Sequence, residues 1–230
     1  MKNLLLLCLL TLMMSCQKNV MANFDIHIEN SDKYDDRRHD LHKMEIYKDG
    51  KIFKILPEES APFLNSNIKL DSLKEGKYSF VYENIFGETI KKEIEVVESI
   101  TYRVSITPDY LLKKNKISIF ENLKEDEAKL VFRSTGCFHQ DKDSVMIINK
   151  DNNYFLRQKN GSLKSIDKAA WAYFVKTENK IREIPEDGDC TTRDEYIFYH
   201  KGKSDTIYDG TCEFSIWYTL KDYLKKNKLQ

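Results

Sequence analysis

From residue 23 to residue 108, apolar and polar residues alternate along the chain with a period of two. The run FDIHIEN at the start of this region is a clear example. Alternation of this kind is typical of strands that bury one face. Asp49-Gly50 lies between two such runs and predicts a hairpin, because this dipeptide tolerates the left-handed turn. With further turns at Glu75-Gly76 and Phe86-Gly87, we expect six or seven short strands arranged as a mainly β sandwich.

The pattern changes after Pro108, and the lysine-rich stretch 109–116 is typical of a linker. Beyond it, alternation predicts hairpins that turn at Asp151-Asn152-Asn153 and at Lys201-Gly202-Lys203. In the segments 165–181 and 213–230, apolar residues instead recur every three or four positions, which favours two helices, the first with Ser165 as a plausible N-cap. We therefore expect residues 117–230 to form an α+β domain with an antiparallel sheet.

The extreme N-terminus is apolar without any periodicity. Lys2 precedes an apolar run from Leu4 to Met14 that is broken only by Thr11, and Ser15 is a small residue suited to a cleavage site. This is the three-part pattern of a secretory signal peptide. A helix needs about 20 apolar residues to cross a bilayer, so this run is too short for a permanent span. We expect residues 1–15 to be removed.

The four residues Met13-Met14-Ser15-Cys16 resemble a bacterial lipobox. The resemblance implies cleavage before Cys16, thioether lipidation of its sulfur and acylation of the new N-terminus, with residues 16–22 as a tether. Three acyl chains would hold the protein on a membrane far more firmly than one. An ordinary secreted protein is the alternative. Gln17-Lys18-Asn19 resembles only the start of a surface-export tag, so we expect the outer membrane, facing the periplasm.

The stretch from Leu70 through Gly76 to Tyr78 is similar to a segment of prealbumin-like sandwich modules, among them the carboxypeptidase regulatory-like modules of bacterial envelope proteins. The resemblance covers residues 23–108 and implies a stalk or interaction module without catalysis. Lysine plus arginine equals aspartate plus glutamate at 37 each. With no basic excess, we expect no nucleic-acid partner.

Three cysteines remain after Cys16, and an oxidising envelope favours a disulfide between two of them. Cys190 and Cys212 are nearly symmetric about the turn at Lys201-Gly202-Lys203, so the hairpin would bring them together. A pairing with Cys137 and the absence of any disulfide stay open as alternatives. We expect Cys137 to be a small buried apolar residue; as a catalytic nucleophile it would need His139 on the same face of a strand.

Other candidate chemistry is sparse. His39 and His42 lie near three aspartates in SDKYDDRRHDLH, but Arg37 and Arg38 inside this stretch oppose a cation, and we expect a solvated loop. Asp187-Gly188-Asp189 lacks the ligand spacing of a calcium loop. The histidines and cysteines show no zinc pattern. We therefore expect no metal, no cofactor and no catalytic site.

These patterns together indicate a lipid-anchored cell-envelope protein that binds a protein or glycan partner and is not an enzyme. Trp171, Trp217 and Tyr218 could form a binding face, although core packing would use most of them. The alternative is an envelope hydrolase with an unrecognised site, for which Cys137 and His139 are the candidate pair.

Overall fold

The computed structural model describes residues 19–37, 39–57, 63–64, 67–112, 117–185 and 188–229. The chain divides into two compact units. Unit 1 contains the described residues of Met1–Ile28, Leu41–Tyr82 and Ile90–Ile106, and unit 2 contains those of Glu29–Asp40, Glu83–Thr89 and Thr107–Gln230. The second unit thus takes two segments from the N-terminal half of the sequence, 29–40 and 83–89.

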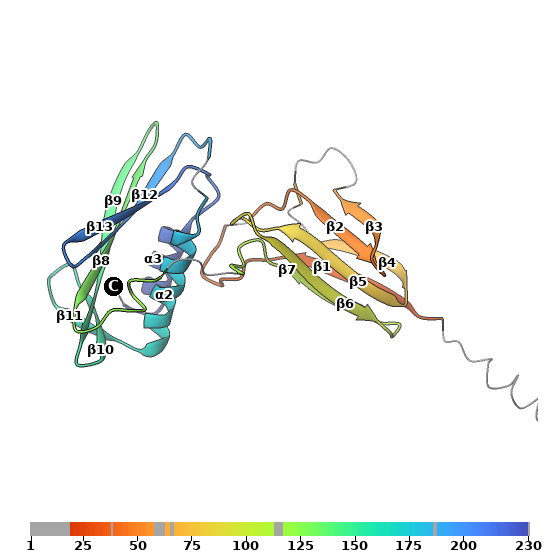
Figure 1. Ribbon diagram of the computed structural model, residues 1–230, viewed down its shortest axis with the longest axis horizontal. Coiled ribbons are helices and arrows are strands. Elements are labelled where there is room, and N and C mark those ends of the chain that lie inside the picture. The colour runs from red at the N-terminus through yellow and green to blue at the C-terminus, as the bar shows by residue number, and fades with distance from the viewer. Residues whose placement is uncertain are drawn as a thin grey trace, which may run out of the picture. The chain divides into compact units, whose positions relative to one another are not determined.

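Unit 1 consists of two β-sheets (Figure 1). The first has the strand order β4-β1-β7 and the second the order β3-β2-β5-β6. The bounds are β1 Met21–Ile28, β2 Met44–Lys48, β3 Lys51–Leu56, β4 Ile68–Lys74, β5 Gly76–Glu83, β6 Thr89–Val96 and β7 Thr101–Ile106. β1 pairs with β4 in the antiparallel sense and with β7 in the parallel sense. The strands predicted from the alternating pattern are confirmed.

The two sheets of unit 1 share one apolar core. Phe24 of β1 has its ring centroid 5.1 Å from that of Tyr78 and 5.2 Å from that of Phe80, both on β5 in the other sheet. All three side chains are buried, as the period-two pattern requires. The hairpin at Asp49-Gly50 is also confirmed, since both residues have positive φ, as a type I′ turn demands. This is a sandwich-like arrangement.

Unit 2 is built on one antiparallel sheet with the strand order β11-β10-β9-β8-β12-β13. The bounds are β8 Glu127–Thr135, β9 Gln140–Lys150, β10 Asn153–Arg157, β11 Leu163–Ile166, β12 Arg193–His200 and β13 Lys203–Asp209. Two-residue turns with positive φ join β9 to β10 at Asp151-Asn152 and β12 to β13 at Lys201-Gly202. Both predicted hairpins are therefore confirmed.

Two helices lie on one face of this sheet, α2 over Lys168–Arg182 and α3 over Ile216–Lys226 (Figure 1). Phe174 and Leu224 are fully buried against the sheet in a core that includes Phe132 and Phe198. The predicted mainly β sandwich followed by an α+β domain with two helices is confirmed for the described residues. None of the helices among those residues is long and apolar enough to cross a membrane.

The start of α2 differs from the prediction. Asp167, and not Ser165, is the N-cap: its Oδ1 accepts a hydrogen bond of 2.7 Å from the main-chain nitrogen of Ala170. Ser165 pairs with Phe155 inside the sheet, as part of β11. Both residue types can cap a helix, so the local sequence does not choose between them. The pairing of Ser165 with Phe155 in the sheet makes the choice, because it leaves Asp167 as the residue that caps the helix.

Candidate functional site

The disulfide predicted at the open end of the β12–β13 hairpin is present. Cys190 and Cys212 are bonded, with a Cα–Cα distance of 5.3 Å that is normal for a disulfide. Beside it, the main-chain nitrogen of Cys190 donates to the oxygen of Gly210. The disulfide therefore closes the hairpin end and fixes the segment that leads from β13 into α3.

Cys137 was expected to be buried, and this prediction is wrong. The thiol is free and exposed, and the neighbouring Phe138 is fully exposed. Both residues lie in the bend between β8 and β9, where the alternation of a strand no longer applies. His139 turns back and its Nε2 is 2.9 Å from the Oγ of Ser134. The structure therefore does not assemble Cys137 and His139 on one strand face, as a thiol nucleophile would require.

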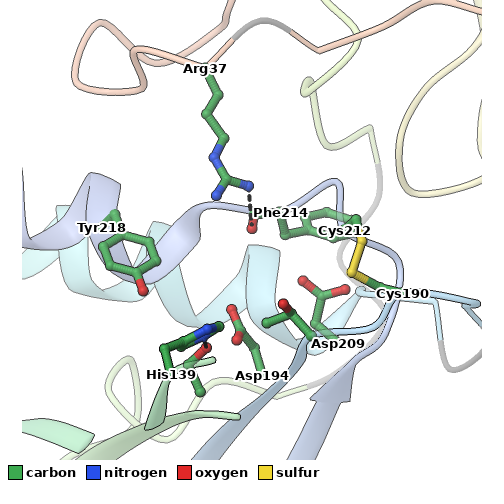
Figure 2. Close-up of a pocket in the computed structure, with 10 residues that line it drawn as sticks. Arg37, His139, Cys190, Asp194, Asp209, Cys212, Phe214 and Tyr218 are labelled. Atoms are coloured by element: carbon green, nitrogen blue, oxygen red, sulfur yellow. Dashed lines mark hydrogen bonds between the residues drawn. A yellow bond between two sulfur atoms is a disulfide. The ribbon is translucent and has the colours of Figure 1, made fainter. Parts of the chain in front are cut away.

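A cavity of about 260 Å³ lies between the ends of β8, β12 and β13 and the start of α3. Figure 2 shows its side chains, with the disulfide at one side. The residues that matter most for its chemistry are Arg37, His139, Asp194, Asp209, Phe214 and Tyr218. All of them belong to unit 2. We call this cavity the acidic pocket, because two aspartates form its floor.

Strand register brings the floor together. Asp194 of β12 is the cross-strand partner of Ser134 on β8 and of Asp209 on β13. Asp194 also shares the helix-facing side of β12 with Tyr196 and Phe198, which belong to the core. The helix-facing side of β12 is therefore aromatic where it contacts the core, at Tyr196 and Phe198. It carries a carboxylate, Asp194, where it borders the pocket.

One buried oxygen of the floor, and one hydroxyl in the core next to it, have hydrogen-bonding capacity that is not used. Asp194 is only 9 % exposed, and its Oδ1 has no hydrogen-bond partner among the described residues. The hydroxyl of Tyr196 is fully buried beside the main chain of Trp217 and also makes no hydrogen bond of normal geometry. Asp209 differs, because its Oδ1 accepts bonds from the nitrogen and the hydroxyl of Thr211. Leaving buried polar atoms unpaired costs about 1–3 kcal/mol each.

The surroundings of Asp194 both raise and lower the pKa of its carboxyl group. Burial raises the pKa of its carboxyl group, Ser134 opposes that shift, and the nearby Asp209 carboxylate raises the pKa further. The positive charge of Arg37 opposes the rise. A carboxylate that is buried, beside a second carboxylate and short of donors is in an unfavourable state for the free protein. A ligand with a positive charge or hydrogen-bond donors would relieve it.

Arg37 reaches the pocket from the segment 29–40. Its Nη1 donates a hydrogen bond of 3.2 Å to the main-chain oxygen of Phe214 (Figure 2). Tyr218, which is 44 % exposed, lines one side of the pocket near His139. The pocket therefore combines an acidic floor, one guanidinium group and two aromatic walls.

The segment around His39 was expected to be a solvated loop. It is a loop, and Asp36, Asp40 and His42 are exposed, but the prediction is wrong for His39 itself. His39 is 6 % exposed, and its Nε2 is 3.0 Å from Oδ2 of Asp35. One ligand atom each from Asp35, His39 and Asp109 lie within 4.8 Å of one another, which is close enough to consider a metal ion. Asp109, placed by the sequence in the 109–116 linker, is 1 % exposed.

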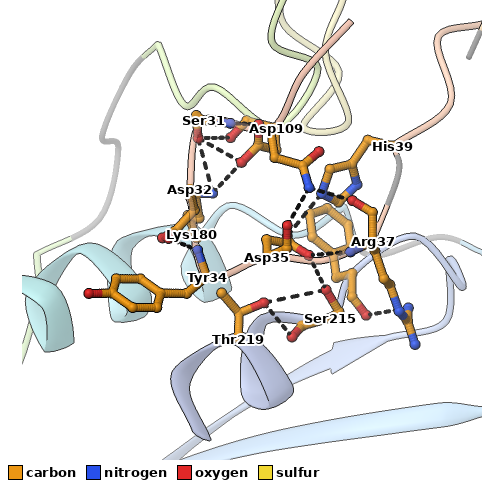
Figure 3. Close-up of polar contacts among 12 residues, drawn as sticks. Ser31, Asp32, Tyr34, Asp35, Arg37, His39, Asp109, Lys180, Ser215 and Thr219 are labelled. Atoms are coloured by element: carbon orange, nitrogen blue, oxygen red, sulfur yellow. Dashed lines mark hydrogen bonds and ion pairs between the residues drawn. The ribbon is translucent and has the colours of Figure 1, made fainter. Parts of the chain in front are cut away.

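These three side chains already have partners, however. Lys180 on α2 is 2.8 Å from Oδ2 of Asp109, and Ser31 donates to both oxygens of that carboxylate (Figure 3). Oδ1 of Asp35 accepts a hydrogen bond from the hydroxyl of Ser215, the N-cap residue of α3. Although burial opposes it, the charge and hydrogen bond of Lys180 hold the pKa of Asp109 below its usual value. The ammonium group of Lys180 thus supplies the positive charge that a metal ion would bring. The contacts of this cluster fix residues 29–40 within unit 2.

The aromatic residues considered for a binding face divide between two roles. Trp217 is buried and stacks on Phe132 with ring centroids 5.2 Å apart, so it is part of the core. Trp171 is half-buried and stacks on Tyr154. Only Tyr218 of the three lines the acidic pocket.

Sequence reasoning missed Asp194, Asp209 and the role of Arg37. One signal for Asp194 was available, since an aspartate at a helix-facing position of the strand RDEYIFYH breaks an otherwise aromatic row. Cys16 and residues 1–15, and also Asp187, lie outside the described residues. The sequence matches no protein-family model, and the search of curated proteins found no relative.

Proposed function

We propose that this chain is a lipid-anchored protein of the bacterial cell envelope, held at the outer membrane through Cys16 and facing the periplasm. Its role is to bind, and not to transform, a small polar ligand in the acidic pocket. The ligand can be free or part of a larger protein or glycan. The lipobox-like residues at Met13 to Cys16 support the anchor, and the pocket supports the binding role.

One observation carries the binding proposal. Oδ1 of Asp194 is buried and has no hydrogen-bond partner among the described residues, and Asp194 lines a cavity of about 260 Å³. Native proteins satisfy nearly all buried polar groups, with protein atoms, ordered water or a ligand. A carboxylate kept short of donors at the floor of a pocket is expected where a ligand supplies them.

The hydrolase alternative gains no support from the geometry. Cys137 lies in an exposed bend, while His139 is bonded to Ser134, whose side chain is almost fully buried. A nucleophile must be able to reach the atom it attacks. The Ser134 hydroxyl is better suited to orient His139 at the pocket wall.

The test is a ligand screen of the mature chain carrying Cys16→Ser, which removes the lipid. Thermal unfolding would be followed against a library of small periplasmic metabolites that includes sugars, amino acids, amines and carboxylic acids. A ligand at 100 times its Kd raises the free energy of unfolding by about 2.7 kcal/mol. We expect at least one compound class to stabilise the protein, and Asp194→Asn to abolish that effect.

The matched control is Asp71→Asn, because Asp71 is an exposed aspartate on β4 in unit 1. It should respond to the ligand as the unaltered chain does. Finding no stabilising compound, or finding compounds that stabilise Asp194→Asn equally, would contradict the proposed function.

A further inference from the structure

We propose that the ligand of the acidic pocket is a free α-amino acid, whose ammonium group meets Asp194 and Asp209 and whose carboxylate meets Arg37. This inference rests on the proposed binding function and specifies the chemical class of the ligand. It follows from the placement of opposite charges around one small cavity.

The floor of the pocket favours a cation over a neutral donor. Asp194 and Asp209 are direct cross-strand partners, so their side chains leave the sheet on the same face, next to each other. Like charges directly opposite each other are destabilising, and the Asp209 carboxylate raises the pKa of Asp194. A sugar hydroxyl could donate to Oδ1 of Asp194, but it would bring no positive charge to the two carboxylates. An ammonium group offers three donors and one positive charge.

The aromatic walls agree with a cation. Phe214 and Tyr218 both line the cavity. The face of an aromatic ring attracts an ammonium group within about 6 Å of its centroid, by roughly 0.5–2 kcal/mol depending on desolvation. The same walls would accept the apolar part of an amino-acid side chain.

Arg37 supplies the opposite charge. One of its N–H groups is used by the main-chain oxygen of Phe214, which carries no charge and does not neutralise the guanidinium. A guanidinium has five donors in a planar fork and binds carboxylates with two parallel hydrogen bonds. In Figure 2 its side chain extends toward the floor where Asp194 and Asp209 lie. The pocket therefore has a place for an anion opposite its place for a cation.

The size of the cavity limits the ligand. Drug-sized ligands occupy pockets of about 300–1,000 Å³. At about 260 Å³, the acidic pocket is below this range and suits a molecule as small as a single amino acid. A zwitterion of this size can contact both charged sides at once, which a simple amine or a simple acid cannot do.

The experiment is isothermal titration calorimetry on the mature chain carrying Cys16→Ser. The twenty L-amino acids are titrated first, and the tightest binder is then compared with its N-acetyl derivative and its methyl ester. We expect each derivative to bind at least tenfold more weakly, because acetylation removes the ammonium charge and esterification removes the carboxylate.

Two variants then assign the charges to their partners. Asp194→Asn should weaken the parent amino acid at least tenfold. Arg37→Gln should weaken the parent similarly but should leave the affinity for the methyl ester almost unchanged, since the ester has no carboxylate to lose. Asp71→Asn is the control and should bind like the unaltered chain. Near-UV circular dichroism of each variant separates lost binding from lost folding.

Each outcome decides something. If amino acids do not bind but a sugar or another compound binds in an Asp194-dependent way, the amino-acid inference is overturned and the proposed function survives. Amino acids that bind equally well to both charge variants would place their site elsewhere and also overturn the inference. If no compound of any class binds, both the inference and the proposed function are refuted.

Discussion

Replacing Lys180 by methionine is expected to destabilise unit 2 by about 3 kcal/mol. Lys180 and Asp109 are 9 % and 1 % exposed, and their charged atoms are 2.8 Å apart. Removing one partner of a buried ion pair typically costs about 3–5 kcal/mol, because the other charge remains buried without compensation. We take the lower end of that range for two reasons. Ser31 still donates two hydrogen bonds to Asp109, and the cavity beside Lys180 gives water access to the site.

The assay is urea unfolding followed by tryptophan fluorescence. Both tryptophans of the chain, Trp171 and Trp217, lie in unit 2, so the signal reports this unit. Lys168→Met is the matched control, because Lys168 is an exposed lysine at the start of the same helix. Changes at exposed positions away from special contacts are usually within about 0.5 kcal/mol.

The pH dependence of the stability cost independently checks whether the loss comes from the Lys180–Asp109 ion pair. Lys180 holds the pKa of Asp109 below its usual value, so the pair stabilises the fold above the ordinary aspartate pKa of about 3.9 and loses this contribution as the pH falls through the lowered pKa. The cost of Lys180→Met should therefore be largest near neutral pH and should shrink in acid, where Asp109 takes up a proton. Adding Asp109→Asn to Lys180→Met should recover most of the loss. A cost below 1 kcal/mol, or one that does not change with pH, would refute the reasoning.

Four further predictions concern the pocket, the thiols and the anchor. Without ligand, Asp194→Asn should stabilise the protein by about 1 kcal/mol at pH 7 in thermal melts, because it removes a buried charge whose Oδ1 has no donor among the described residues. Since the folded pKa of Asp194 is raised, this gain should disappear as the pH falls below that pKa, and a destabilised variant would contradict the reasoning. Replacing Cys190 and Cys212 together by alanine should cost about 3 kcal/mol in urea unfolding, and a cost near zero would show that the closed loop contributes nothing. Cys137 should react with a maleimide in the native protein as fast as a small free thiol, which a buried sulfur would not do. Cys16→Ser should abolish metabolic labelling by a palmitate analogue and release the protein from the membrane fraction, whereas retention of the label would disprove the lipobox assignment.

The sequence by itself determined the secondary structure of both units to a large extent. The period-two pattern of β1 and the positive-φ turns at Asp49-Gly50 and Lys201-Gly202 are properties of neighbouring residues, so they can be read locally. The disulfide between Cys190 and Cys212 followed from the same local symmetry, because a hairpin brings together residues equally distant from its turn.

Only the tertiary structure decided the chemistry. Cys137 is exposed because β8 ends before it, and His39 is buried because Asp35 and α3 pack around its loop. The acidic pocket depends on the sheet register that pairs Asp194 with Asp209, and on a loop that brings Arg37 beside Phe214, 177 positions further along the sequence. Local patterns reveal which face of an element is apolar. They do not reveal which distant elements share that face, and a binding site is built from such long-range neighbours.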